Sequence, residues 1–390
     1  MVASAPSERF LTWPFALVFL INFLQGLAIH PYLHLPGFLT RLGAGEMLVG
    51  LVFGTMSGAA IVVRPFAGRV MDDRGRRGVI LVASVLHVVV CFLYTTVHDI
   101  GAWLFTVRAL QGVAIGALFS SLFTYAADIV PASRRTQGIA IFGVSGMLPM
   151  SLGGLLGDWV LERWDYHELF LITAGLAGAA LLLSFALPEP ERSRATGRGF
   201  FGAAVQTDLL PVWFVGSMMA TALAGLFTFV KTYTTEYLHF GSVGLFFSWY
   251  TGAAIVLRVG FGWLPERLGP MRVYYPSMVG LALALVALSQ ARSPAWIALA
   301  GALAGTGHGY AFPILSTIAV NRAHPADRGS AMSLFTAIFD AGILIGGPAL
   351  GALAQVSDYR TMFLVASVLP LIGISVFHVW DAPHRKAAAG

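Results

Sequence analysis

Three ionisable side chains interrupt long apolar stretches of the sequence, at Arg108, His308 and Asp340. Such groups are costly to bury in an apolar environment, so they often mark the path of an ion, a proton or a substrate. Asp340 could exchange a proton or recognise a substrate cation. Arg108 could bind an anion or a carboxylate, or control a proton-carrying acid. His308 could hydrogen-bond a substrate or titrate.

Each of these residues also has a purely structural interpretation. Arg108 lies about seven residues into its stretch, or about 10 Å along a helix, so its side chain could extend to the membrane surface. Asp340 could be permanently hydrogen-bonded beside the packing glycines that follow it, and His308 could be a packing histidine. We expect Arg108 and Asp340 to face a cavity and leave both interpretations open for His308.

Polar side chains recur on single helical faces near these groups. Residues three apart share a face, as Asn22 does with Gln25, and Arg108 with Gln111. The predicted proton-coupling and substrate cavity contains Asp340, Arg108, His308, Gln111, Asn22, Gln25, Tyr32 and Tyr310. We predict no metal site and no cofactor.

The apolar stretches that must position these side chains predict a membrane protein. Residues of the AVILMFWYC set make up 57% of the 390-residue chain and DEKR residues 11%, against about 25% charged in ordinary soluble domains. This excludes a nucleic-acid-binding domain and a typical soluble enzyme. Twelve helices of about 20 residues fit the length. The predicted spans are 12–33, 47–67, 78–97, 101–125, 138–157, 167–187, 209–230, 244–263, 272–291, 295–318, 331–354 and 360–380.

The distribution of Lys and Arg predicts the orientation of these spans. With the N-terminus in the cytoplasm, eighteen of the 24 basic residues fall on the cytoplasmic side, five fall on the other side and Arg108 lies within a span. This bias predicts an even number of spans with both termini cytoplasmic. The charged, proline-containing segment 188–208 is the predicted cytoplasmic linker between six-helix bundles at 1–187 and 209–390.

An internal repeat relates the two predicted bundles at an offset of 194 residues. It pairs Arg64 with Arg258, Gly68 with Gly262, Asp72 with Glu266, Gly75 with Gly269, and Pro131-Ala-Ser-Arg134 with Pro325-Ala-Asp-Arg328. Apart from Ser133 and Asp327, which differ, these are seven matched positions, of which six are identical and one keeps an acid. Repeated transmembrane halves with a site between them are typical of secondary transporters.

The same residues resemble the major facilitator superfamily, over nearly the whole chain. Gly68-x-x-x-Asp72-x-x-Gly75-Arg76-Arg77 is similar to the signature loop of that family, and Arg108-x-x-Gln111-Gly112 to its second motif. The resemblance implies two pseudo-symmetric six-helix bundles, alternating access around a central cavity, and a monomer. The pattern of antiporters in span five is degraded here, because Leu148 precedes Pro149 in place of glycine.

The loop residues form a predicted conformational latch. Charges at a helix terminus interact with its dipole, so Asp72 could pair with a neighbouring helix end or basic group when the cytoplasmic side closes. Ordinary topogenic charge is the alternative, and Arg64 and Arg258 could extend to the membrane surface. The predicted latch contains Gly68, Asp72, Gly75, Arg76, Arg77, Glu266, Arg64 and Arg258.

These observations predict a secondary active transporter, not an enzyme, that exports a small amphiphilic molecule in exchange for protons. The alternatives are uptake or facilitated diffusion of an anionic metabolite bound by Arg108, and a sensor in the membrane that transports nothing. The chain lacks paired catalytic carboxylates and nucleophile motifs. Its expected partners are the substrate, protons and the lipid bilayer, and its expected location is a bacterial inner membrane.

Overall fold

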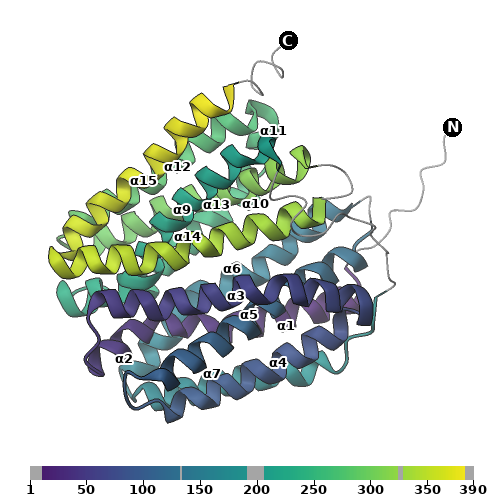
Figure 1. Ribbon diagram of the computed structural model, residues 1–390, viewed down its shortest axis with the longest axis horizontal. Helices are drawn as coiled ribbons and strands as arrows, with labels where there is room; N and C mark the ends of the chain where they lie inside the picture. Colours follow the sequence, from purple (N-terminus) through teal and green to yellow (C-terminus); the bar gives the residue numbers. More distant parts are fainter. Residues whose placement is uncertain (1–10, 132–133, 191–205, 324–327, 383–390) are drawn as a thin grey trace.

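The computed structural model of the chain describes residues 11–131, 134–190, 206–323 and 328–382, and its long elements are helices that run side by side (Figure 1). The helices of the N-terminal half are α1 (Trp13–Ile29), α2 (Leu35–Arg41), α3 (Glu46–Arg74), α4 (Arg76–Leu93), α5 (Ala102–Ile129), α6 (Arg135–Leu161) and α7 (Tyr166–Ser184). Those of the C-terminal half are α9 (Leu210–Lys231), α10 (Val243–Phe261), α11 (Leu264–Leu268), α12 (Pro270–Ser289), α13 (Pro294–Arg322), α14 (Arg328–Val356) and α15 (Tyr359–Trp380).

Eleven of the described helical segments are long and apolar enough to cross a membrane. The remaining predicted span, 295–318, lies within the 29-residue helix α13. Its apolarity is lowered by Thr306, His308 and several glycines. Together these twelve helices confirm the predicted all-α polytopic membrane fold.

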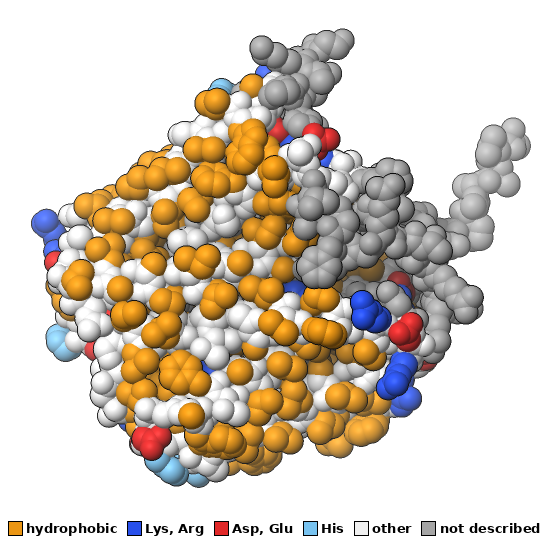
Figure 2. Space-filling model, in the orientation of Figure 1, with side chains coloured by type: hydrophobic (Ala, Val, Ile, Leu, Met, Phe, Trp, Pro, Cys, Tyr) orange, Lys and Arg blue, Asp and Glu red, His pale blue; other side chains and the backbone are white. Residues whose placement is uncertain are grey.

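The surface of the molecule is apolar where these helices meet their surroundings. Hydrophobic side chains spread over the face in Figure 2, and most of the charged side chains in that view lie away from its centre. Val82, Leu182 and Val259 are 72%, 72% and 76% exposed. In a bilayer such side chains contact acyl chains, so their exposure carries no penalty.

The two halves meet along two helix pairs, α3 with α14 and α6 with α10. Figure 1 shows α14 lying beside α3. The repeat relates α3 to α10 and α6 to α14. The α3–α14 contact therefore corresponds to the α10–α6 contact. Each pair includes a close glycine contact: a Cβ added to Gly50 would lie 2.2 Å from the Gly347 carbonyl oxygen, and one added to Gly154 would lie 3.3 Å from the Gly244 Cα. Small residues thus let the halves approach closely.

Candidate functional site

An ion pair joins the two halves at the α3–α14 contact. The Arg64 guanidinium donates to Asp340 Oδ2 from Nε at 3.0 Å and from Nη2 at 2.6 Å. The Arg64 side chain is 9% exposed and that of Asp340 is 17% exposed. Arg64 also stacks over the ring of Phe119 on α5, 5.5 Å from its centroid. A charge-assisted pair in these surroundings is strong because little water screens it.

The pair changes the interpretation of both residues. The alternative in which Arg64 extends to the membrane surface does not hold, because its guanidinium turns to a carboxylate on the opposite half. The charge of Asp340, which we predicted from sequence as a cavity group, is compensated by that same guanidinium. Asp340 belongs to the predicted cavity and Arg64 to the predicted latch, and the structure brings the two residues together.

Arg108 lies inside the N-terminal half and does not face a cavity, contrary to our expectation. Its side chain is 1% exposed. Nη1 donates to Gln111 Oε1 at 2.6 Å, Nε donates to the Val52 carbonyl at 3.2 Å, and the guanidinium lies over the ring of Phe53. The Tyr94 hydroxyl donates to the same Gln111 oxygen at 2.7 Å. These contacts stabilise the buried cation within one bundle.

The polar face of α1 also turns into its own bundle. Asn22 Nδ2 donates to Ser145 Oγ at 2.8 Å, and Gln25 Nε2 donates to Ser84 Oγ at 3.0 Å. Tyr32 pairs with a threonine hydroxyl on α7 at 3.4 Å. Asn22, Gln25 and Tyr32 are at most 8% exposed. We correct their assignment from cavity lining to polar networks between helices, which satisfy side chains that lipid could not.

His308 lies in an aromatic surrounding within the C-terminal half. Its Nδ1 pairs with the Tyr250 hydroxyl, and its Nε2 is buried without a hydrogen-bond partner. The rings of Phe227, Phe312 and Phe339 have centroids 6.4, 5.6 and 5.9 Å from that of His308. Two of the predicted cavity residues, His308 at Nε2 and Gln111 at Nε2, thus keep a buried polar atom without a hydrogen-bond partner among the described residues.

Tyr310, the other predicted cavity residue on α13, is 8% exposed, and its hydroxyl donates to the Phe261 carbonyl at 2.8 Å. This bond ties α13 to the end of α10. Arg258, one turn before that end, donates from Nε to the Gly309 carbonyl at 3.2 Å. The alternative in which Arg258 extends to the membrane surface therefore does not hold, because its guanidinium turns to α13.

The predicted latch is built around the turn between α3 and α4. Gly75 has φ +97°, and a Cβ there would lie 2.3 Å from Glu189 Oε1, so both the backbone angle and the space require glycine. Glu189 accepts hydrogen bonds from the backbone N–H groups of Arg76 at 2.7 Å and Arg77 at 3.0 Å. Arg76 Nε donates to Asp128 Oδ2 at 2.9 Å. Glu189 and Asp128 were not predicted, because neither belongs to the motif.

The remaining latch residues contribute less to this arrangement. The side chain of Asp72 lies outside the described residues. Gly68 has open space where a Cβ would lie. Glu266, which the repeat relates to Asp72, is exposed on the short helix α11 and makes no ion pair with a described residue. The repeat therefore preserves an acidic residue without reproducing the network around Arg76.

Replacing Glu189 with glutamine is expected to lower the free energy of unfolding by about 1 kcal/mol. A carboxylate that accepts from the first N–H groups of α4 satisfies them and complements the helix dipole, effects worth about 0.5–2 kcal/mol. Chemical denaturation of the purified protein measures the loss. Glu266→Gln, at an exposed acid, is the matched control and should change nothing, so an equal loss in both variants would contradict the capping role.

A further polar contact joins the halves at the α6–α10 pair. Asp158 Oδ1 pairs with His34 Nε2 at 2.9 Å, and its Oδ2 accepts from the backbone N–H of Gly244 at 2.7 Å. His34 and Asp158 belong to the N-terminal half, while Gly244 begins α10. Asp158 was not predicted as a site residue, because it lies one residue beyond the predicted span 138–157.

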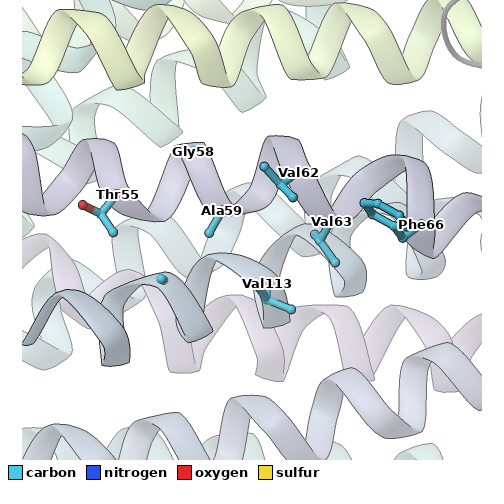
Figure 3. A pocket seen from close by; sticks show the side chains of 8 residues that line it. Thr55, Gly58, Ala59, Val62, Val63, Phe66 and Val113 are labelled. Atoms are coloured by element: carbon cyan, nitrogen blue, oxygen red, sulfur yellow. The ribbon is translucent and has the colours of Figure 1, made fainter. Parts of the chain in front are cut away.

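An apolar groove of about 600 Å³ lies between α3 and α5 (Figure 3). Thr55, Gly58, Ala59, Val62, Val63, Phe66, Ala109 and Val113 line it. No charged side chain lines it, and Val62 and Phe66 are 64% and 61% exposed. Acyl chains suit such a surface, so we do not place the polar site there. Among the described residues, no cluster of three or more His, Cys, Asp or Glu could hold a metal.

Comparison with known proteins identifies the family of the chain. The sequence model of the Major Facilitator Superfamily matches residues 15–323 and 212–390. The chain belongs to the Major Facilitator Superfamily. Superfamily members are transporters, so the protein is a membrane transporter and not an enzyme.

Relatives within the superfamily include an export protein and a multidrug resistance protein. The chain is 22% identical over 383 residues to the staphylopine export protein of Staphylococcus aureus, with 93% of this chain and 94% of that protein covered. It is 24% identical over 404 residues to the multidrug resistance protein MdtG of Serratia proteamaculans, with 98% and 97% covered.

Solved structures share the fold. The nucleoside transporter NupG (D323A mutant) aligns with a TM-score of 0.79 at 15% identity, covering 94% of this chain and 99% of that chain. The human organic anion transporter MFSD10 aligns with a TM-score of 0.75 at 20% identity, covering 96% and 100%.

Proposed function

We propose that this superfamily member is a proton-coupled secondary transporter that exports small amphiphilic molecules by alternating access. The observation that carries the proposal is the Arg64–Asp340 ion pair, which joins α3 of one half to α14 of the other. A titratable carboxylate at a contact that must change during transport can link proton binding to movement of the halves.

The mechanism follows from the charge of Asp340. While Asp340 is ionised, its carboxylate holds Arg64 and keeps the α3–α14 contact closed. A proton on Asp340 removes the negative charge and one acceptor for the guanidinium, which weakens the contact by the strength of a charge-assisted bond. The halves can then separate there. Release of the proton restores the pair, so each cycle carries a proton.

The proposed direction of transport, orientation and location are supported by observations other than the ion pair. Two of the relatives are described as an export protein and a multidrug resistance protein, and both are bacterial. The excess of Arg and Lys on the predicted cytoplasmic side supports cytoplasmic termini. We therefore place the protein in a bacterial inner membrane, acting as a monomer, with residues 1–187 and 209–390 as its two bundles.

Reconstituted vesicles with a trapped pH-sensitive dye test the coupling. We expect a substrate from a panel of lipophilic cations, sugars, amino acids and organic acids to trigger a pH change with the wild type. Asp340→Asn, which cannot carry the proton, should abolish the pH change while the protein stays folded. Asp165→Asn is the matched control, since that acid pairs with Arg41 at an exposed position.

The outcomes separate the alternatives. Substrate movement with no pH change in the wild type would replace coupled export by facilitated diffusion. Binding without movement would indicate a sensor. Uptake of an anion bound by Arg108 has less support, because Gln111, the Val52 carbonyl and Phe53 already surround that guanidinium.

A further inference from the structure

The second copy of the repeat contains an arginine without the acid that its counterpart has. The offset of 194 residues relates Arg64 to Arg258, and the same offset relates Asp340 to Gly146. The two glycine contacts between the halves, Gly50 with Gly347 and Gly244 with Gly154, give a second alignment. If these contacts correspond, Gly347 of α14 matches Gly154 of α6, and the counterpart of Asp340 is then Met147. Neither residue carries a charge, so the acid is missing under both alignments.

The position of Arg258 is fixed by a proline on α13. In a regular helix the Gly309 carbonyl would accept from the N–H of residue 313, but Pro313 has none. Arg258 Nε donates to that carbonyl at 3.2 Å and replaces the missing bond. In the first copy the residue equivalent to Pro313 is Phe119, over which Arg64 stacks.

Because only Nε contacts the Gly309 carbonyl, Nη1 and Nη2 of Arg258 are available to bind another group. Arg258 is half-buried and forms no ion pair with any described residue. Its Nη1 lies 3.7 Å from where a Cβ on Gly143 of α6 would be. Nη1 therefore lies at the α6–α10 contact between the halves, where even a half-buried cation is costly unless an anion or water compensates it.

The groups beside Arg258 suit an aromatic or amphiphilic anion. The carbonyl that Arg258 holds belongs to Gly309, next to His308, whose Nε2 is buried without a partner. When Tyr250 donates to His308 Nδ1, Nε2 carries the hydrogen and is a second donor. The rings of Phe227, Phe312 and Phe339 surround His308 and supply apolar surface.

We propose that Arg258 and His308 form a subsite for the carboxylate of an amphiphilic organic anion whose apolar part packs on these rings. The planar guanidinium matches a carboxylate with two parallel hydrogen bonds. In the first copy of the repeat an internal carboxylate, that of Asp340, occupies this role. The inference rests on the proposed function only in that the ligand is the transported substrate.

Binding to the purified full-length protein in detergent tests the subsite, with phenylacetate, phenylacetamide and phenethylammonium as probes of one ring and three charges. We expect the wild type to bind phenylacetate at least tenfold more tightly than either other probe, measured by tryptophan fluorescence and by thermal stabilisation. Arg258→Gln should abolish this preference. Equal binding of acid and amide, or no binding of phenylacetate by the wild type, would overturn the proposal.

A second variant keeps the arginine and its bond to Gly309. Gly143→Asp would place a carboxylate beside Arg258 Nη1, reproducing the pairing of the first repeat, and should also abolish the preference for phenylacetate. Gly143→Ala should retain it, because a Cβ there meets only that Nη1, at ordinary contact distance. If both Arg258→Gln and Gly143→Asp still prefer phenylacetate, the proposed subsite is wrong.

The assay separates this proposal from the proposed function. It uses no membrane and no gradient, so proton coupling does not affect it. If the protein prefers the carboxylate probe but shows no pH change in vesicles, the proposal of proton coupling is wrong and the proposed subsite stands. If Asp340→Asn abolishes a pH change in vesicles but the wild type shows no carboxylate preference in detergent, proton coupling stands and the proposed subsite is wrong.

Discussion

Replacing Arg64 with alanine is expected to lower the free energy of unfolding by about 3 kcal/mol. The variant would leave Asp340 at the α3–α14 contact without its guanidinium. Removing one partner of a buried ion pair costs about 3–5 kcal/mol, and the lower end applies because the Asp340 side chain is 17% exposed. Asp340→Ala should cause a loss of similar size for the same reason. Chemical denaturation of the purified protein measures both losses.

The double variant distinguishes an ion pair from two independent contributions. Arg64→Ala combined with Asp340→Ala leaves no unpaired charge, so we expect it to be more stable than either single variant. Arg41→Ala is the matched control, because the Arg41–Asp165 pair is 61% and 66% exposed, and exposed pairs contribute about 0–1 kcal/mol. Additive losses at Arg64 and Asp340 would show that the two charges are not coupled.

Sequence predicted the architecture because the membrane imposes a strong and local constraint. Each span must be about 20 residues of mostly apolar helix, so hydropathy finds it without knowledge of its neighbours. The least apolar span, now α13, was still found, since its two ends are bounded by Pro294 and Arg322. The repeat then indicated two related halves.

The partner of each polar residue could not be predicted in the same way. Asn22 and Gln25 do share a face of α1, but helical spacing does not say whether that face turns to the centre of its own bundle or to the opposite half. Arg64 and Asp340 are 276 residues apart in sequence. Their pairing depends on α3 lying against α14, and each residue had a reasonable interpretation alone.

The proline on α13 carries information about one of these partners. Pro313 removes the helical partner of the Gly309 carbonyl, so some donor must replace it. The repeat places an arginine on a neighbouring span, at Arg258. The proline and the repeated arginine are both visible in the sequence, whereas the missing acid at Arg258 is recognised only after the structure pairs Arg64 with Asp340.

Replacing Gly50 with alanine is expected to reduce transport at least tenfold. A Cβ at this position would lie 2.2 Å from the Gly347 carbonyl oxygen and 2.7 Å from the Pro348 nitrogen. These atoms are backbone of the opposite half, so they cannot move aside as a side chain would. The substitution should hold α3 away from α14, and a transporter that must close this contact in each cycle would stall.

Cross-linking between the halves tests whether closure is the step that fails. The Gln355 side chain comes within 3.5 Å of where a Cβ on Gly45 would be, so cysteines at both positions should react with a short bismaleimide. The single native cysteine, Cys91, is buried, which keeps the background low. We expect the cross-linking yield to fall with Gly50→Ala.

Gly175 on α7 provides the matched control, because nothing lies within 4 Å of where its Cβ would be. Gly175→Ala should therefore preserve both transport and cross-linking. If Gly50→Ala transports normally while cross-linking falls, closure at this end is not required for the cycle. If both are normal, α3 and α14 do not approach as closely in the membrane as the Gly50–Gly347 contact requires, and the Arg64–Asp340 pair loses the helix contact that positions it.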